Sequence, residues 1–363
     1  MISFDFTEEQ QMLVDSVRRY AEREMRKSIH DMDEARQLPD GLIDKGWELG
    51  LIPSSIPEEY DGFGEHSAIT GVLYAEELAW GDVSATLALL APNLVSIPVL
   101  EYGTAEQKES LLPKFCDDEF FCATSALVEP SITFDPYNLK TKAINEDGHY
   151  ILNGNKVYVP LADTANYVLV YANEDGKTQG FLVEKDTTGL QIVAREHNMG
   201  LGALPTYKVN LENCKLPATA KIGGEEGLNF ERLHAYSNVA LAAMAVGQAK
   251  ASYEYAVEYA KDRQAFGEAI AQRQSIAFML ADMATEIDGT RLMVWETAWK
   301  LDQGENASQE ATLVRRYASD MVLTVTDGSV QTLGGHGYIR DHPVEMWLRN
   351  GRGFAIFDGI AIV

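Results

Sequence analysis

Asp358 is the only acidic residue in the apolar segment AIFDGIAIV, residues 355–363. A carboxylate in a dry pocket can serve as a general base, because loss of water raises its pKa toward neutrality. Asp358 also precedes Gly359, and the dipeptide Asp-Gly is a common turn signal. The local sequence therefore leaves two interpretations open, a catalytic base and a turn residue.

The cysteines give no sign of metal or disulfide chemistry. Cys116, Cys122 and Cys214 are widely spaced and form no CxxC pair. Such spacing is typical neither of a zinc site nor of a disulfide framework. We therefore predict no metal site.

The net charge narrows the classes of partner. The chain has 30 Lys and Arg residues against 55 Asp and Glu residues, a formal net charge of −25. This charge repels nucleic-acid phosphates and anionic lipid headgroups. No apolar run approaches the ~18 residues of a membrane helix, and the start MISFDFTEEQ lacks a secretory signal pattern. We therefore predict a cytoplasmic protein that binds neither nucleic acid nor membranes.

Helices are expected to build the first region, residues 1–118. Thr7 and Gln10 have the spacing of a capping box, which predicts a helix from residue 8 onward. Further helices are expected around residues 66–80 and 104–115.

The second region, residues 119–225, changes to short strands. Its strand-like segments are separated by three turn signals, Asp147-Gly148, Asn153-Gly154 and Asp175-Gly176. The pattern predicts a small antiparallel sheet domain.

The third region, residues 226–363, returns to the helical period. It predicts one helix of about 35 residues and two more over residues 272–303 and 307–333. Gly304 and Gly334-Gly335 end helices two and three, and Pro343 begins a short last one. Long helices of similar length pack as an antiparallel bundle. The predicted fold class is α+β, with an N-terminal helical domain, a middle β domain and a C-terminal four-helix bundle.

Three segments of the chain resemble the acyl-CoA dehydrogenase family. YAKDRQAFGEAIAQRQSIAFMLADMATEI (259–287) contains R-x-x-F-G with a Gln eleven residues after the Arg, and residues 329–359 contain Q-x-L-G-G-x-G-Y. LENCKLP (211–217) is the third. The order of the three predicted regions, first helices, then a sheet and then a helical bundle, also matches the family. The resemblance therefore spans nearly the whole chain.

The resemblance implies an activity. Family members oxidise acyl-CoA thioesters to trans-2-enoyl-CoA with bound FAD, as in β-oxidation, and pass electrons to an electron-transfer flavoprotein. A carboxylate removes the α-proton in this reaction. The resemblance also implies dimers, or dimers of dimers, in which each FAD lies across a subunit interface.

The half of the FAD site that a family member offers to its neighbour is intact. It consists of an Arg, a Phe, two Gln and a Gly-Gly turn, here Arg263, Phe266, Gln274, Gln331, Gly334 and Gly335. By the resemblance, these residues contact the pyrophosphate and adenosine. Considered singly, Gly334-Gly335 is equally well a helix C-cap and Arg263 a solvated helix end.

The half that would bind the chain's own flavin departs from the family. Family members read T-E-P-x-A-G-S-D where this chain reads VEPSITFD, so Val128 replaces a Thr and Phe134 a Ser. In KVYVPLA, Tyr158 keeps an aromatic ring, whereas Pro160 lacks both a hydroxyl and a backbone N–H. We predict weak binding of the chain's own flavin.

The resemblance aligns Asp358 with the family's catalytic Glu. Asp is one methylene shorter, and a misplacement of ~1 Å can lower a rate about 10²-fold. The second family position for this Glu is Ser237 here, and the neighbouring Asn238 replaces a substrate-side Arg. We interpret Asp358 as a remnant rather than a working base.

Three hypotheses follow. The first is a non-catalytic subunit that completes the FAD site of a companion acyl-CoA dehydrogenase subunit in a heteromer such as a heterotetramer. The second is a self-sufficient homo-oligomeric enzyme with Asp358 as its base. The third is a non-enzymatic interaction protein on the same fold. The identity of the acyl group does not follow from the sequence.

Overall fold

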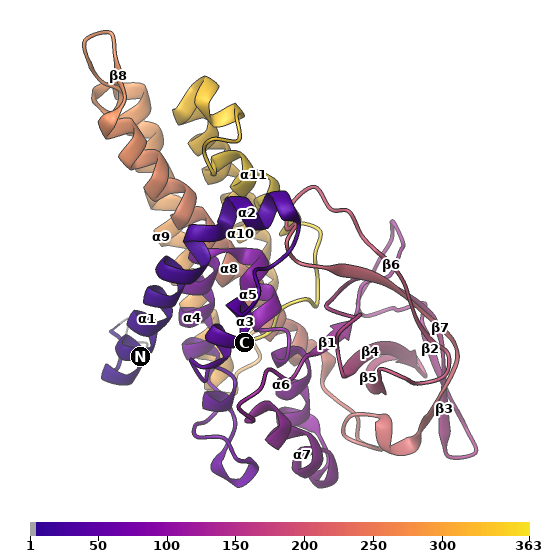
Figure 1. Ribbon diagram of the computed structural model, residues 1–363. Coiled ribbons are helices and arrows are strands. Elements are labelled where there is room, and N and C mark those ends of the chain that lie inside the picture. Colours follow the sequence, from indigo (N-terminus) through magenta and orange to yellow (C-terminus); the bar gives the residue numbers. More distant parts are fainter. Residues whose placement is uncertain (1–4) are drawn as a thin grey trace.

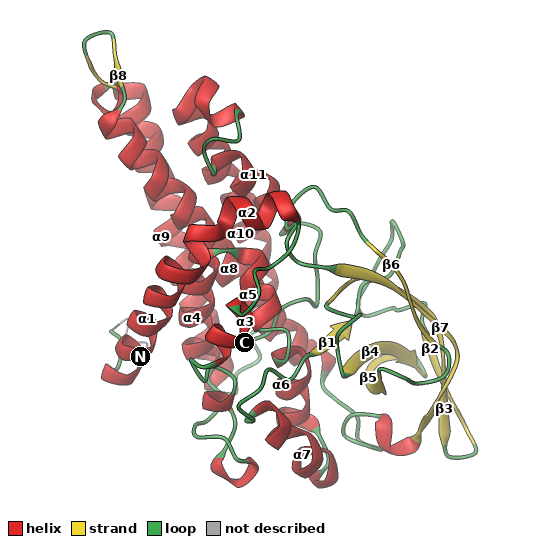
Figure 2. Cartoon of the chain, viewed as in Figure 1, coloured by secondary structure: helices red, strands yellow, loops and turns green. Residues whose placement is uncertain are grey.

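The computed structural model describes residues 5–363. Long helices form one side of the molecule and a seven-stranded sheet the other (Figures 1 and 2). The helices come from both ends of the chain and the sheet from its middle. The predicted α+β fold with helical, sheet and helical regions is confirmed.

The N-terminal region begins with the predicted capping box. The backbone N–H of Gln10 donates to Thr7 Oγ1 at 3.2 Å, and the N–H of Thr7 donates to Gln10 Oε1 at 3.1 Å. The helices are α1 (Glu8–Tyr20), α2 (Ile29–Ala35), α3 (Leu42–Trp47), α4 (Ala68–Gly81), α5 (Val83–Leu89), α6 (Asn93–Tyr102) and α7 (Ala105–Leu111). α4 and α7 match the predicted helices. The sequence did not predict α5 or α6, because burial on nearly all sides leaves them without a polar face.

The first turn of α4 is capped by a residue from far along the chain. Asp302, the last residue of α9 (Gln274–Asp302), accepts hydrogen bonds from Ser67 Oγ at 2.9 Å and from two backbone N–H groups. These are the N–H groups of Ala68 at 2.6 Å and Ile69 at 3.1 Å. A carboxylate at this position also complements the helix dipole.

The sheet has the strand order β1-β4-β2-β3-β7-β6, and β5 pairs with β4. The strands are β1 (Ala123–Ala126), β2 (Lys142–Glu146), β3 (His149–Pro160), β4 (Tyr167–Glu174), β5 (Lys177–Glu184), β6 (Leu190–Arg195) and β7 (Thr206–Pro217). Asp147-Gly148 and Asp175-Gly176 form the predicted turns with positive φ angles. The prediction of a purely antiparallel sheet is wrong in two pairings. β1 and β2 both run parallel to β4. The β2–β3 hairpin lies in the connection from β1 to β4, and β3 makes the return between β2 and β4.

The predicted turn at Asn153-Gly154 is also wrong. Both residues lie inside β3, where the register with β7 shifts between Leu152 and Gly154. A Cβ atom on Gly154 would lie 2.3 Å from Thr141 Oγ1. Glycine is needed here for close approach at a bulge rather than for a turn.

The C-terminal region forms the predicted bundle. Its helices are α8 (Phe230–Asp262), α9, α10 (Ser308–Leu333) and the short α11 (Val344–Gly353). A hairpin of β8 (Gln264–Ala265) and β9 (Glu268–Ala269) connects α8 to α9 and projects from the end of the bundle (Figure 1). α4 also packs against α8 and α9, so the N-terminal region contributes to the bundle core.

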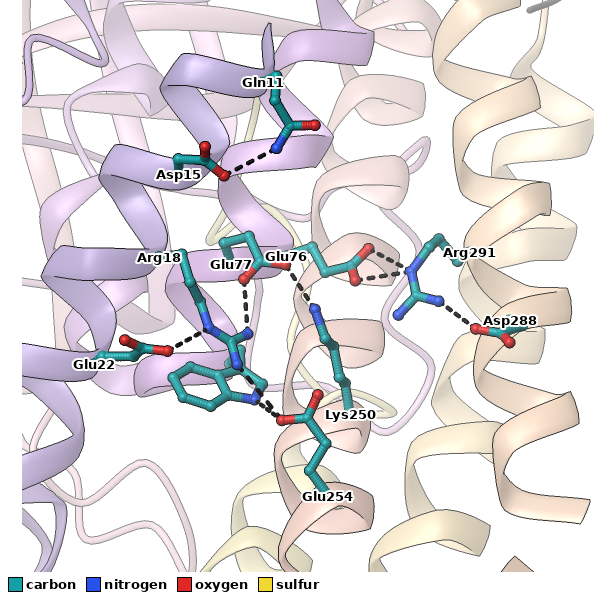
Figure 3. A network of polar contacts seen from close by, with 11 residues as sticks. Gln11, Asp15, Arg18, Glu22, Glu76, Glu77, Lys250, Glu254, Asp288 and Arg291 are labelled. Atoms are coloured by element: carbon teal, nitrogen blue, oxygen red, sulfur yellow. Dashed lines mark hydrogen bonds and ion pairs between the residues drawn. The ribbon is translucent and has the colours of Figure 1, made fainter. Parts of the chain in front are cut away.

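A network of charged residues attaches α4 to its neighbours (Figure 3). Arg291 on α9 donates from Nε to both carboxylate oxygens of Glu76, at 2.8 and 3.1 Å. Glu77 accepts from Lys250 on α8 and Arg18 on α1, both at 2.8 Å. Burial raises the pKa of Glu76 despite the nearby cations. Burial acts in the same direction on Glu77, but Lys250 and Arg18 together hold its pKa below the ordinary value.

Replacing Asp82 by Asn is expected to stabilise the fold in a pH-dependent manner. Asp82 caps α5 through the N–H of Ala85 at 2.8 Å, and burial raises its pKa from 3.8 to about 6 despite its backbone hydrogen bonds. A carboxyl whose pKa is higher in the folded state lowers the free energy of unfolding as pH rises between these two values. Asn keeps the cap and removes the charge. Asp82→Asn should therefore gain about 1–3 kcal/mol at pH 7.5 and less at pH 4.5, measured by urea denaturation. An effect that does not change with pH would contradict this assignment.

Candidate functional site

The residues predicted to face a neighbouring subunit gather at one end of the bundle. All six are exposed, and they come from the end of α8, the hairpin, the start of α9, the end of α10 and the following turn η8 (Gly334–Tyr338). Phe266 lies in the hairpin loop with 98% of its surface exposed and a φ of 54°. The set comprises Arg263, Phe266, Gln274, Gln331, Gly334 and Gly335.

The Gly334-Gly335 turn ends helix α10 and also leaves open space around its glycines. Gly334 is the C-cap of α10, and its φ of 59° favours glycine. A Cβ atom at either glycine would meet no other atom within 4 Å. The turn is therefore a helix cap whose outer surface is open to a ligand.

The residues of the degraded flavin half offer few polar groups. The side chains of Val128 and Pro160 are buried, and Phe134 is half-buried against the core. The carbonyl of Val128 already accepts from the N–H of Val157 at 2.9 Å. The ring of Tyr158 meets the ring edge of Phe357, with centroids 5.3 Å apart. Three of the four positions have no side-chain donor for a flavin.

The loop that carries Val128 is nevertheless firmly attached. Lys156 is fully buried, and its Nζ donates to the carbonyl of Leu127 at 2.9 Å and to Glu129 Oε1 at 3.1 Å. Burial lowers the pKa of Lys156 to about 8, against the opposing effect of Glu129. Glu129 also accepts from the N–H groups of Lys140 and Thr141. The scaffold of the loop is present, although its contact residues have changed.

Asp358 is paired with a histidine. His234, in the first turns of α8, places Nε2 at 3.0 and 3.1 Å from the two carboxylate oxygens of Asp358. His234 Nδ1 lies 3.1 Å from the hydroxyl of Tyr137. The sequence reasoning missed His234 and Tyr137. The available signal was that His234 precedes Ser237 by one helical turn and therefore shares its face.

A half-buried arginine fixes the segment before Asp358. Arg315 on α10 donates from Nη2 to the carbonyls of Phe354 and, at 2.8 Å, Phe357. Its Nη1 donates to Ser319 Oγ at 2.6 Å. Burial lowers the pKa of Arg315 to about 10, and the charge of Asp358 opposes this effect. The position of Asp358 is therefore defined by contacts on both sides.

The cavity beside this pair is nearly filled. Its volume is about 20 Å³, and its lining includes His234, Ser237 and Gly359. Residues 360–363 are buried, with the carbonyl of Gly359 accepting from Ser125 Oγ at 2.8 Å. Among residues 5–363, Ser237 Oγ has no hydrogen-bond partner. Such a volume accommodates about one water molecule and no acyl chain.

Asn238 and the three cysteines, the remaining residues singled out in the sequence, lie away from the cavity beside Asp358. Asn238 is buried like Ser237, but it does not line the cavity beside Asp358. Burial raises the pKa of each of Cys116, Cys122 and Cys214 to about 11. Within residues 5–363, no cluster of three or more His, Cys, Asp or Glu side chains could hold a metal ion. In the same range, no single helix has the length and apolarity to cross a membrane. A bent pair, α5 with α6, meets that test by length and composition only.

The chain is 33% identical to an acyl-CoA dehydrogenase of Bacillus subtilis (strain 168), over 97% of its own length and 95% of that protein. The chain belongs to the acyl-CoA dehydrogenase family. The family's N-terminal, middle and C-terminal domain models match residues 7–119, 124–214 and 225–361.

Two further proteins are similar to this chain. Subunit CarC of the caffeyl-CoA reductase–Etf complex of Acetobacterium woodii is 32% identical over 99% of this chain and 96% of that subunit. A solved FAD complex of PigA shares the fold with a TM-score of 0.90. It is 27% identical over 98% of this chain and 95% of that chain.

The two halves of an acyl-CoA dehydrogenase FAD site fit this chain unequally. At the bundle end, an exposed guanidinium and an open Gly-Gly turn each suit a pyrophosphate. At the chain's own flavin position, Val128 supplies no hydroxyl, and Pro160 supplies neither a hydroxyl nor a backbone N–H. The bundle end therefore fits part of FAD, and the chain's own flavin half does not fit the ring.

The chain alone is expected not to bind butyryl-CoA. The cavity beside Asp358 has no room for even a short acyl group, since residues 360–363 pack beside it. Isothermal titration calorimetry should give a Kd above about 1 mM for the wild type and for Asp358→Asn alike. Micromolar binding that Asp358→Asn weakens would show instead that the cavity opens for a substrate.

Proposed function

We propose that this chain is the flavin-completing, non-catalytic subunit of a heteromeric acyl-CoA dehydrogenase. In this proposal a companion subunit carries the catalytic base and most of the flavin contacts. This chain supplies Arg263, Phe266, Gln274, Gln331 and the Gly334-Gly335 turn across the interface. The acyl-CoA substrate binds to the companion.

One contrast within the molecule carries the proposal. The bundle end is open and exposes all six residues, whereas Asp358 is paired with His234 beside a cavity of about 20 Å³. A working base must reach the α-carbon of its substrate. A carboxylate whose two oxygens both face an imidazole, beside a cavity of only about 20 Å³, lacks that reach.

The chemistry in this proposal belongs to the heteromer. Bound FAD would supply the acceptor for the hydride that leaves the β-carbon of the thioester. The residues of this chain bind and orient the pyrophosphate and adenosine through charge-assisted and backbone hydrogen bonds. The FAD complex of the relative PigA supports the choice of cofactor.

The electron acceptor is proposed to be an electron-transfer flavoprotein. The name of the relative CarC places it in a complex with Etf, which supports this choice. The net charge of −25 supports a cytoplasmic location away from anionic membranes. The proposed domains are residues 1–118, 119–225 and 226–363.

A second candidate is a self-sufficient enzyme, favoured by the alignment of Asp358 with the family's Glu. One experiment distinguishes the two candidate functions. The chain is expressed alone and together with its genomic neighbour, and FAD per chain is measured from flavin absorbance after denaturation. We expect a colourless protein alone and stoichiometric FAD per pair when co-expressed. Stoichiometric FAD in the chain alone would overturn the partner-subunit proposal, and no FAD in either case would indicate an interaction protein.

A further inference from the structure

We propose that two tyrosine–histidine pairs, Tyr259–His336 and Tyr255–His342, are positioning residues for the FAD-completing end of the bundle. This inference rests on the proposed function and adds residues that the family motifs do not include among the FAD contacts. The pairs act by fixing the distance between Arg263 and the Gly334-Gly335 turn.

The pairs connect two parts of the chain that are far apart in sequence. The hydroxyl of Tyr259 lies 2.6 Å from His336 Nδ1, and the hydroxyl of Tyr255 lies 2.7 Å from His342 Nδ1. The rings of His336 and His342 are 5.7 Å apart, and Tyr259 also contacts the ring of His342 at 5.6 Å. Four rings thus form one cluster between the last turns of α8 and the segment that precedes α11.

Each end of the first pair is directly attached to a residue of the proposed FAD site. The N–H of Arg263 donates to the carbonyl of Tyr259 at 2.9 Å, one helical turn earlier. His336 directly follows Gly335. The Tyr259–His336 hydrogen bond therefore links the guanidinium-bearing helix end to the open glycine turn.

The tyrosines and Arg263 face the same side. They line one groove of about 360 Å³ together with Glu258 and Asp262. Each pair engages only Nδ1 of its histidine. Each of the two rings therefore has its Nε2 outside the pair.

Positioning matters because a pyrophosphate held from two directions tolerates little displacement. The guanidinium and the glycine N–H groups must both lie within hydrogen-bond distance of the same ligand. Loss of one phenol–imidazole hydrogen bond should weaken FAD binding by about 5-fold, and loss of both by about 20-fold. The fold should change little, since Phe retains the aromatic ring.

The test uses the heteromer co-expressed with the genomic neighbour. FAD affinity is measured by flavin fluorescence during titration of apo-heteromer with FAD. Tyr259→Phe and the double variant Tyr255→Phe/Tyr259→Phe should raise the Kd for FAD by about 5-fold and about 20-fold. The matched control is Tyr253→Phe on the same helix. Tyr253 lies six residues before Tyr259, on a different face of α8.

A pair of histidine variants separates positioning from general stability. His336→Gln keeps a hydrogen-bond acceptor and should retain most of the affinity, whereas His336→Leu should behave like Tyr259→Phe. Equal FAD affinity in all variants, or an equal loss in Tyr253→Phe, would overturn the inference. If the wild-type pair of chains takes up no FAD, the proposed function itself fails and the inference fails with it.

Discussion

Arg263→Ala is expected to weaken FAD binding by the proposed heteromer by about 30- to 1000-fold, because a guanidinium makes paired, charge-assisted hydrogen bonds to a pyrophosphate. Arg263 is exposed at the end of α8, so its removal should leave the free energy of unfolding of the isolated chain almost unchanged. The measurement is FAD per pair of chains after gel filtration, followed by titration of the apo-heteromer with FAD.

The matched control for this prediction is Arg316→Ala. Arg316 is an exposed arginine near the other end of the bundle, in a surface ion pair with Asp320. It should retain FAD as the wild type does, since surface ion pairs contribute little. If the Arg263→Ala heteromer binds FAD as tightly as the wild type, the proposal that this chain contacts FAD is wrong.

Arg291→Ala is expected to lower the free energy of unfolding by about 3–5 kcal/mol, because it leaves the buried Glu76 carboxylate without its closest cation. Burial already raises the pKa of Glu76 in the wild type, and loss of Arg291 should raise it further. A raised pKa favours the folded state at low pH. The destabilisation should therefore shrink as pH falls. Urea denaturation at pH 5.5 and 8 measures both effects.

A double-mutant cycle tests whether the pair accounts for this loss. Adding Glu76→Gln to Arg291→Ala removes the unpaired charge, so the double variant should recover part of the lost stability. Simple additivity of the two single variants would show that Arg291 stabilises the bundle through packing alone.

Local sequence predicted the features that depend on local physics. The capping box of Thr7 and Gln10, the turn at Asp147-Gly148 and the ends of α9 and α10 follow from neighbouring residues. Asn153-Gly154 has the same local signature, but its conformation depends on the contact with Thr141 across the sheet. A dipeptide alone does not distinguish a turn from a bulge.

The candidate site also has features that follow from sequence motifs and features that depend on contacts between distant residues. The residues at the bundle end were predicted because their types and spacing form family motifs, and all six are exposed in the structure. Their role in a shared site stays a prediction. The state of Asp358 was not predictable, because its partner His234 is 124 residues away. The filling of the adjoining cavity depends on how residues 360–363 pack, which no motif encodes.

The cap of α4 by Asp302 has a consequence for the order of events during synthesis. The two residues joined, Ala68 and Asp302, are separated by 234 positions. At typical elongation rates of about 5–20 residues per second, the ribosome needs roughly 12–47 s between them. During this interval α4 has its local N-cap, Ser67, but lacks the Asp302 carboxylate, and its packing partners are synthesised one after the other, first α8 and then α9. The apolar surface of α4 is therefore fully covered only once α9, which ends at Asp302, has been made, and chaperones that shield apolar helices are expected to bind the nascent chain before then.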